Sequence, residues 1–361
     1  MSLTDKDFLG NYPDCAARPL VPSPGAIFQS SFEDIDEQAA QLVGHDQRYQ
    51  QLSPGRFRGR FTTAELGGDA WLFLEETNQA LAQHCHVPPG MVSFMFLLGP
   101  AQRVRLERDD FGPEDLALFR GSTHFAISCP ADTIFCVITL EEHRLARTLG
   151  SAGDQTAPGS YRLQSRHMGP TVGALRSLVG TFLSMIAAND DPADDVLAQL
   201  HLKEALLSTL ALAVSTGART EPSLPAPLFG QALALIDAEL AAVSVTGLCT
   251  RLDVSRRTLE DTFRRQLGIG PARFMKARRL NEIRRQLQVD RHRPVADIAS
   301  EWGLWHPSHF TQSYAEMFGE LPSKGRRQTA AEAKHDVALP PMAGLSPIIP
   351  DLSKRSSICG V

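Results

Sequence analysis

The apolar residues between positions 245 and 271 recur about fifty residues later, and this repeat constrains the fold more than any other feature of the chain. Four positions match at an offset of 50, namely Val245, Leu248, Leu252 and Val254 with Val295, Ile298, Trp302 and Leu304. Five more match at an offset of 51, namely Leu259, Phe263, Leu267, Gly268 and Pro271 with Phe310, Tyr314, Phe318, Gly319 and Pro322. The spacing predicts two copies of one unit, each a short helix, a tight turn and a second helix.

The second helix of each copy has an apolar side and a polar side. In the first copy Ser255 occupies an N-cap position, Leu259, Phe263 and Leu267 point inward, and Gly268 ends the helix. In the second copy Phe310, Tyr314 and Met317 point inward. A second helix with a polar outer face is typical of helix-turn-helix proteins, in which it enters the major groove. The predicted DNA-reading residues are Ser255, Arg256, Arg257, Glu260, Asp261 and Arg264 in the first copy, and His306, Ser308, His309 and Gln312 in the second.

A third helix is predicted between the copies, from Pro271 to residue 288. Its apolar positions follow a helical spacing, and about 18 residues at ~1.5 Å each give a rod of roughly 27 Å. One turn of duplex DNA is about 34 Å, so a rigid rod of this length would place both second helices in successive major grooves on one face of the DNA. Candidate phosphate contacts are Arg265, Arg284, Arg285, Lys324, Arg326 and Arg327.

Charge is divided unevenly along the chain. Residues 231–328 carry 16 Lys and Arg against 11 Asp and Glu, a net charge of +5, whereas the rest carries 20 against 30, a net charge of -10. A basic C-terminal part on an acidic body is typical of a protein that contacts phosphate with one end only.

The predicted fold class is α+β with several domains. Short aromatic and β-branched runs separated by Pro and Gly predict a β-barrel or jelly-roll-like sandwich before residue 150, and a helical period begins at Thr171. The predicted ranges are a flexible N-terminus (1–30), a β-rich effector-sensing domain (31–150), a helical association and dimerisation segment (165–217), a linker (218–228), a DNA-binding domain with two helix-turn-helix motifs (229–328) and a disordered tail (329–361).

Motifs for catalysis or for a metal are weak. The six cysteines form no C-x-x-C pair, and no nucleophile elbow, P-loop or H-E-x-x-H motif occurs. His84 and His86 share a strand face without a third ligand, so no metal, cofactor or catalytic residue is predicted. His124 is a candidate for lining an effector pocket. The longest apolar run falls short of a membrane span, which predicts a cytoplasmic protein without membrane contact.

The stretch "VADIASEWGLWHPSHFTQSYAEMFGELPS" resembles the second motif of the AraC/XylS transcription regulators. Three features depart from that pattern: Gln312 stands where the family often has a basic residue, "PSKGRRQ" lacks the usual Tyr-Arg, and Glu260 and Asp261 are acidic. Through "YQQLSPGRFRGRFT" and "SRRTLEDTFRRQLGIGP" the chain is also similar to the ethanolamine-utilisation operon regulators. The resemblance implies an effector-sensing N-terminal domain and activation of a catabolic operon, so the expected partners are promoter DNA, a small organic effector such as an ethanolamine-like amine, and RNA polymerase. The helices after Thr171 are expected to pair either within the chain or between the subunits of a homodimer.

Two alternatives stay open at this stage. One is a cupin-type metal-dependent oxygenase in which the helical part is an accessory domain. The other is a regulator without a small ligand, whose β-rich domain binds a protein partner.

Overall fold

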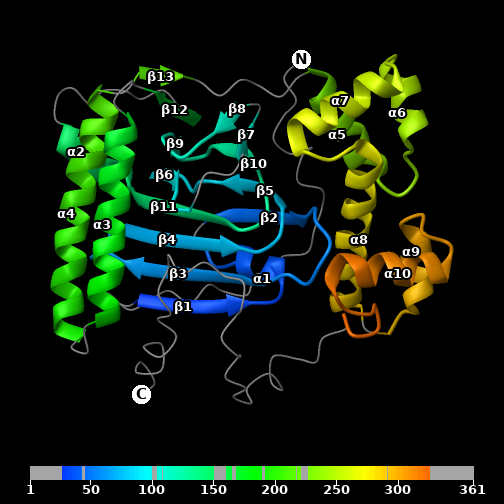
Figure 1. Cartoon of the computed structure of the whole chain (residues 1–361), viewed down its shortest axis with the longest axis horizontal. Helices are drawn as coiled ribbons and strands as arrows, with labels where there is room; N and C mark the ends of the chain where they lie inside the picture. The colour runs from blue at the N-terminus through cyan, green and yellow to red at the C-terminus, as the bar shows by residue number, and fades with distance from the viewer. Residues whose placement is uncertain are drawn as a thin grey trace. The chain divides into compact units, whose positions relative to one another are not determined.

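A computed structural model describes residues 27–42, 45–99, 104–107, 109–149, 160–164, 168–188, 192–216, 218–220, 227–290 and 292–325. By their contacts these residues form two compact units. The first, here called the β-rich unit, contains the described residues from 27 to 49 and from 58 to 220. The second, here called the helical unit, contains Gln50–Phe57 and the described residues from 227 onward. Figure 1 labels the elements of both units.

The β-rich unit contains two antiparallel sheets. The larger sheet has the order β1 (Ile27–Phe32), β3 (Gly59–Glu65), β4 (Ala70–Thr77), β11 (Thr133–Glu141), β6 (Met91–Leu97), β9 (Leu116–Arg120), β12 (Ser160–Gln164) and β13 (Ala218–Thr220). The smaller sheet has the order β2 (Asp46–Gln51), β5 (Leu81–His86), β10 (His124–Cys129), β7 (Val104–Leu106) and β8 (Asp109–Phe111). The sequence predicted a β-barrel or a jelly-roll-like sandwich. The strands do not close into a barrel, and the arrangement in two sheets agrees with a sandwich.

Both faces of the larger sheet are covered, which explains the long apolar runs in its strands. In β4, Leu72 and Leu74 pack with the helices of this unit, whereas Phe73 and Glu75 point to the opposite face. The same alternation continues on the neighbouring strand β11. A strand buried on both faces loses the simple apolar and polar alternation of a half-exposed strand.

Four helices belong to the β-rich unit: α1 (Ile35–Ala39), α2 (Glu142–Leu149), α3 (Met168–Ala188) and α4 (Pro192–Thr216). The long helices α3 and α4 run side by side (Figure 1) and join the apolar core of the larger sheet. Residues Met168–Ala188 and Val196–Thr216 are long and apolar enough to cross a membrane by length and composition. Their buried faces, however, belong to the core of the unit.

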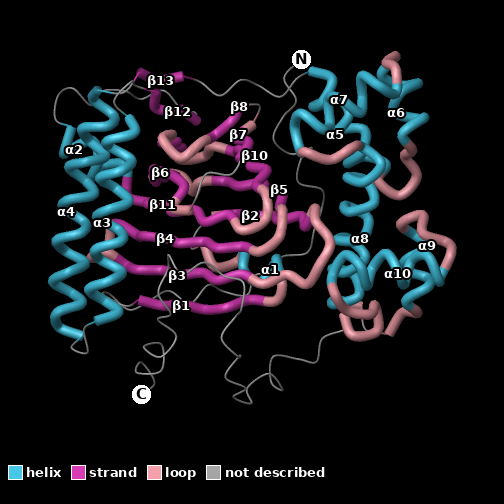
Figure 2. Tube along the Cα trace, in the orientation of Figure 1, coloured by secondary structure: helices cyan, strands magenta, loops and turns pink. Residues whose placement is uncertain are grey.

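The helical unit contains only helices and loops apart from the end of β2 (Figure 2). Its helices are α5 (Pro227–Glu239), α6 (Val245–Leu252), α7 (Arg256–Leu267), α8 (Pro271–Val289), α9 (Val295–Glu301) and α10 (Pro307–Phe318). The pairs α6–α7 and α9–α10 are the two predicted copies. In both copies the turn between the helices contains a left-handed residue at equivalent positions, Asp253 (φ 51°) and Gly303 (φ 76°).

Some predicted ranges differ from the observed elements. Residues 27–30 of the predicted flexible N-terminus lie in β1, and residues 218–220 of the predicted linker lie in β13. The predicted association segment also contributes one side of its helices to the core of the β-rich unit, so it is not a separate layer. The rest of the predicted N-terminus, residues 221–226 of the linker and the predicted tail lie outside the described residues.

The packing of α3 on the sheet yields a stability prediction. Leu175 is fully buried in this core, so Leu175→Ala should lower the free energy of unfolding by about 2–5 kcal/mol. Met185 on the same helix is 46% exposed, and Met185→Ala should change the free energy of unfolding by only ~0.5 kcal/mol. Urea denaturation of the full chain measures both. Equal effects of the two substitutions would show that α3 does not pack on the sheet in solution.

Candidate functional site

Helix α7 presents one side to the unit and the other to solvent. Ser255 caps its N-terminus, with the hydroxyl accepting from the backbone N–H of Thr258 at 3.1 Å, and Gly268 ends it in a left-handed conformation (φ 72°). Both predicted caps are therefore present. Leu259 and Phe263 are fully buried, and the Phe263 ring packs against Phe274 of α8 with 5.6 Å between centroids. The inward side of α7 thus fixes the direction of its outward side.

The outward side of α7 carries charges of both signs. Ser255, Arg256, Arg257, Asp261 and Arg264 are exposed, and the side chain of Arg257 is 92% exposed. The two acidic residues pair along the helix, Asp261 with Arg257 at 3.9 Å and Glu260 with Arg264 at 3.4 Å. Exposed pairs of this kind contribute little stability, so the arginines can exchange carboxylate for DNA at small cost.

Helix α10 repeats this arrangement with different side chains. Phe310, Tyr314 and Met317 are buried as predicted, whereas His306, Ser308, His309 and Gln312 are exposed. His306 occupies the N-cap position without a capping hydrogen bond from its side chain, and its ring lies 6.2 Å from that of His309. The amide of Gln312 donates to Glu316 at 2.8 Å. The second outward side is therefore rich in histidine and hydrogen-bonding groups, whereas the first is rich in arginine.

Trp305 is a candidate that the sequence reasoning missed. It directly precedes the N-cap of α10 and is 72% exposed. An exposed tryptophan at the start of a second helix places a flat apolar surface beside the predicted reading residues. The repeat aligns Trp302 and Leu304 but skips this turn position, although a large aromatic residue next to a cap was visible in the sequence.

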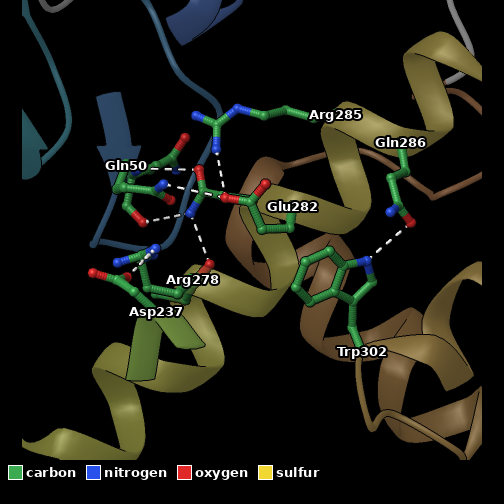
Figure 3. A network of polar contacts seen from close by, with 10 residues as sticks. Gln50, Asp237, Arg278, Glu282, Arg285, Gln286 and Trp302 are labelled. Atoms are coloured by element: carbon green, nitrogen blue, oxygen red, sulfur yellow. Dashed lines mark hydrogen bonds and ion pairs between the residues drawn. The ribbon is translucent and has the colours of Figure 1, made fainter. Parts of the chain in front are cut away.

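Helix α8 connects the two copies as one uninterrupted helix of 19 residues, which at ~1.5 Å per residue is about 28 Å long. Pro271 occupies its first turn, as predicted. Near its start α8 contacts α7 through Phe274, and near its end Gln286 accepts a hydrogen bond from the Trp302 indole N–H at 2.9 Å, which ties it to the second copy (Figure 3).

The predicted phosphate contacts lie in different surroundings. Arg265 and Lys324 are exposed. Arg285 is half-buried and pairs with Glu282 at 3.0 Å. Arg284 is buried, pairs with Glu320 at 3.3 Å and lies 4.8 Å from the centre of the Phe318 ring, so its prediction as a phosphate contact is corrected to a structural role. Arg326 and Arg327 lie outside the described residues.

Two further arginines of α8 fasten α5 and the turn that follows it. Arg278 pairs with Asp237 of α5 at 2.7 Å (Figure 3). Arg279 donates to the backbone carbonyls of Leu240 and Val243 at 2.7 and 2.6 Å. Part of the basic charge of this region therefore serves the fold, which the overall charge count could not reveal.

A small cavity of about 30 Å³ lies inside the β-rich unit. Most of its lining is aromatic or aliphatic, with a few polar groups on strands of both sheets: Leu42, His45, Gln47, Phe73, Glu75, Gln83, Cys85, Val87, Ser93, Met95, Phe119, Phe125, Ile127, Phe135 and Val137. This volume exceeds the ~10–15 Å³ that one water molecule needs, so the cavity has room for water or a very small group. A larger molecule therefore requires the lining side chains to move.

Glu75 is the buried acid of this cavity. Gln38 donates to its carboxylate at 3.1 Å, and the Tyr49 hydroxyl also bonds to it. Burial raises the pKa of Glu75 above its usual range, although these polar neighbours act in the opposite direction. The Tyr49 hydroxyl donates its proton to Gln47, another lining residue of the same strand β2.

The predicted histidine candidates lie elsewhere. His124 is exposed on β10 and stacks on His86 of β5 with 4.3 Å between ring centroids, and it does not line the cavity. Its role as an effector contact therefore stays a prediction, and the cavity described above is lined by other residues. His84 and His86 share one face of β5, and the part of the chain described by the structure contains no group of three metal-binding side chains.

Comparison with known proteins supports the helix-turn-helix assignment. Residues 248–328 match the family model described as "Helix-turn-helix domain". The chain is 24% identical over 241 residues to the XylDLEGF operon transcriptional activator 3 of Pseudomonas putida, covering 64% of this chain and 71% of that protein. It is 30% identical over 109 residues to the XylDLEGF operon transcriptional activator of the same species, but covers only 34% of that protein.

Two further proteins are similar to this chain, one in sequence and one in structure. The HTH-type transcriptional regulator GbdR of Pseudomonas aeruginosa is 29% identical over 133 residues, which are 37% of this chain and 35% of that protein. The crystal structure of the AraC-like transcriptional activator CuxR covers 71% of this chain and 94% of that chain, with 15% identity and a TM-score of 0.38.

The three curated relatives are transcriptional activators or regulators. The family model matches the residues in which the structure places the two helix-turn-helix copies. Residues 248–328 therefore form a helix-turn-helix domain, and the chain is similar to transcriptional activators.

Proposed function

We propose that the whole chain is a cytoplasmic, sequence-specific DNA-binding activator of a catabolic operon, controlled by a small organic effector. The observation that carries the proposal is the pair of solvent-exposed helix faces on α7 and α10, both attached to the single helix α8. A helix length of about 28 Å approaches one turn of DNA, so both faces can enter the same side of the duplex.

The proposed DNA contacts divide into base reading and phosphate binding. Arg257 and Arg256 suit guanine, Glu260 and Asp261 suit the amino group of cytosine, and the second copy offers hydrogen-bonding groups on His306, Ser308, His309 and Gln312. We add Trp305, whose exposed ring suits a thymine methyl group or a sugar. Arg265, Arg285 and Lys324 are the proposed phosphate contacts among the described residues.

The cavity of the β-rich unit is the proposed effector site. Its aromatic lining suits a small apolar body, and the carboxyl group of Glu75 suits a hydrogen-bond donor or a cation, as an organic amine provides. The similarity to ethanolamine-utilisation regulators favours the same class of ligand. Because the cavity is small in this structure, binding would move its walls and shift the population of conformations.

Two protein partners complete the proposal. Activation requires contact with RNA polymerase. A second copy of the chain is the proposed occupant of the outer side of α4, where Leu197 and Leu212 are 56% and 58% exposed although the other side of the helix is buried in its own core.

Arg257 provides a direct test of base reading. Arg257→Ala should weaken binding of the full chain to promoter DNA recovered by genome-wide mapping of its bound sites, by about 1–3 kcal/mol, and binding should fall steeply with salt. The side chain is almost fully exposed, so the fold should not change. Arg147→Ala on α2 removes the same charge from the β-rich unit and should leave affinity unchanged. Fluorescence anisotropy measures both, and wild-type affinity of Arg257→Ala would exclude Arg257 as a base contact.

The effector proposal predicts a thermal shift. A small primary amine that binds only the folded state should raise the melting temperature of the full chain in proportion to the logarithm of its concentration. Glu75→Gln should abolish the shift, because the amide cannot carry the charge that balances an ammonium group. A screen of primary amines by thermal unfolding, with matching alcohols as controls, provides the measurement. An equal shift in the variant would rule out Glu75 as the contact.

The raised pKa of Glu75 also predicts how stability depends on pH. The folded carboxyl keeps its proton to a higher pH than the unfolded one, whose pKa is about 4.3. Its contribution to stability is therefore complete below the unfolded pKa and is lost as the pH rises through the folded pKa. Between pH 4 and 7 the wild type should lose stability relative to Glu75→Gln, as measured by urea denaturation. Glu204→Gln, an exposed change on α4, is the control, and a difference that does not vary with pH would contradict the prediction.

A further inference from the structure

Residues Gln50–Phe57, with the sequence QQLSPGRF, belong by their contacts to the helical unit, although the residues on both sides of them in the chain belong to the β-rich unit. We call this segment the strap. The strap is part of the stretch YQQLSPGRFRGRFT, which resembles the ethanolamine-utilisation operon regulators. None of the proposed DNA or effector contacts lies in it. Its contacts with α8 and α10 give it a function of its own.

The strap binds the middle of α8 through its backbone. The Asn281 side chain accepts from the backbone N–H of Gln51 at 3.1 Å and donates to the Gln51 carbonyl at 3.0 Å. The amide of Gln50 donates to Glu282 at 3.4 Å (Figure 3). Asn281 and Glu282 are only 2% and 3% exposed. The strap thus buries two polar residues of α8 and forms hydrogen bonds with both. Buried polar groups in folded proteins almost always have such partners.

The strap also binds the C-terminal end of α10. The backbone N–H of Gly55 donates to the carbonyls of Glu316 and Met317 at 2.9 and 3.1 Å, and the amide of Gln51 donates to Met317 at 2.7 Å. The last carbonyls of a helix have no partner within the helix and need one from outside. The strap supplies that partner to the second DNA-reading helix.

Gly319, directly after α10, shows how closely the strap approaches. A Cβ atom at this glycine would lie 2.9 Å from Cβ of Arg56 and 3.0 Å from its backbone nitrogen. Gly268 is the equivalent glycine after α7, with a similar left-handed conformation (φ 72° against 67°), but a Cβ atom there meets nothing within 4 Å. The close approach is therefore specific to the second copy.

Strand β2 leads directly into the strap. Gln47 lines the cavity and Tyr49 bonds to both Gln47 and Glu75, whereas the next two residues, Gln50 and Gln51, hold α8 and α10. Successive residues of one extended strand lie only ~3.3 Å apart along it, so a backbone shift at Tyr49 reaches its neighbours. A change in the cavity that displaces Tyr49 therefore also displaces the anchors on α8 and α10.

We propose that the strap is a positioning element, which holds the second recognition helix on α8 and transmits the state of the cavity to it. The transmission part rests on the proposed effector site, whereas the holding part does not. The outward residues Ser308 and His309 of α10 stay exposed with the strap bound, so the strap does not cover them and the proposed DNA-binding state keeps it in place. Release of the strap should weaken DNA binding through the second copy.

Hydrogen exchange of the full chain, without DNA or effector, tests whether the strap holds α10. Asn281→Ala and Gly319→Ala should each speed exchange in peptides covering residues 50–57 and the end of α10 by about tenfold or more, because they remove or displace buried hydrogen bonds. Gly268→Ala imposes a similar backbone strain and should leave exchange in 50–57 at the wild-type rate. Equal exchange in all four proteins would overturn the proposal.

Two further readouts separate the strap from the proposed function. Tyr49→Phe removes the hydroxyl that links Gln47 and Glu75, and should speed exchange in 50–57 while β4 and β11 keep their protection; an unchanged rate would overturn transmission. With promoter DNA, Gly319→Ala should bind at least about tenfold more weakly than Gly268→Ala. Equal affinity would overturn the positioning role. If wild-type protein bound no promoter, the proposed function would fail, while the exchange experiment would still decide whether the strap holds α10.

Discussion

The continuity of helix α8 is the constraint on which the rest of the helical unit depends. Two short helix pairs cannot bury enough apolar surface alone, so each packs its second helix against this shared helix, through Phe274 at one end and Phe318 at the other. Stiffness follows from hydrogen bonding along the whole helix, which contains no proline after its first residue. The direction of both outward faces is thus set by one element.

Polar residues on different sides of α8 bind different parts of the helical unit. Arg278 and Arg279 fasten α5 and the turn that follows it, Arg284 is buried against Phe318, and Asn281 and Glu282 receive the strap. Three of its arginines are therefore engaged within the helical unit, whereas Arg273 and Lys276 of the same helix are exposed. The reading chemistry lies on α7 and α10, where side chains remain exposed and paired only weakly.

The repeat, both glycine stops, the Ser255 cap and the inward residues of α7 and α10 followed from the sequence, because caps and helical spacing are local signals. The sequence predicted either a β-barrel or a sandwich and did not decide between them, because strand pairing depends on residues that are far apart in the chain. Arg284 was misjudged because the sequence shows the residue type but not the side of the helix that becomes buried. The strap was invisible as such, since its partners lie some 230 residues away in the chain.

Hydroxyl-radical footprinting of the full chain on its mapped promoter tests the central claim most directly, namely that two reading helices on one stiff helix enter the same side of DNA. For one bound chain, two protected segments about 10–10.5 base pairs apart on one face of the duplex are expected. A single protected segment, or two segments on opposite faces, would contradict it.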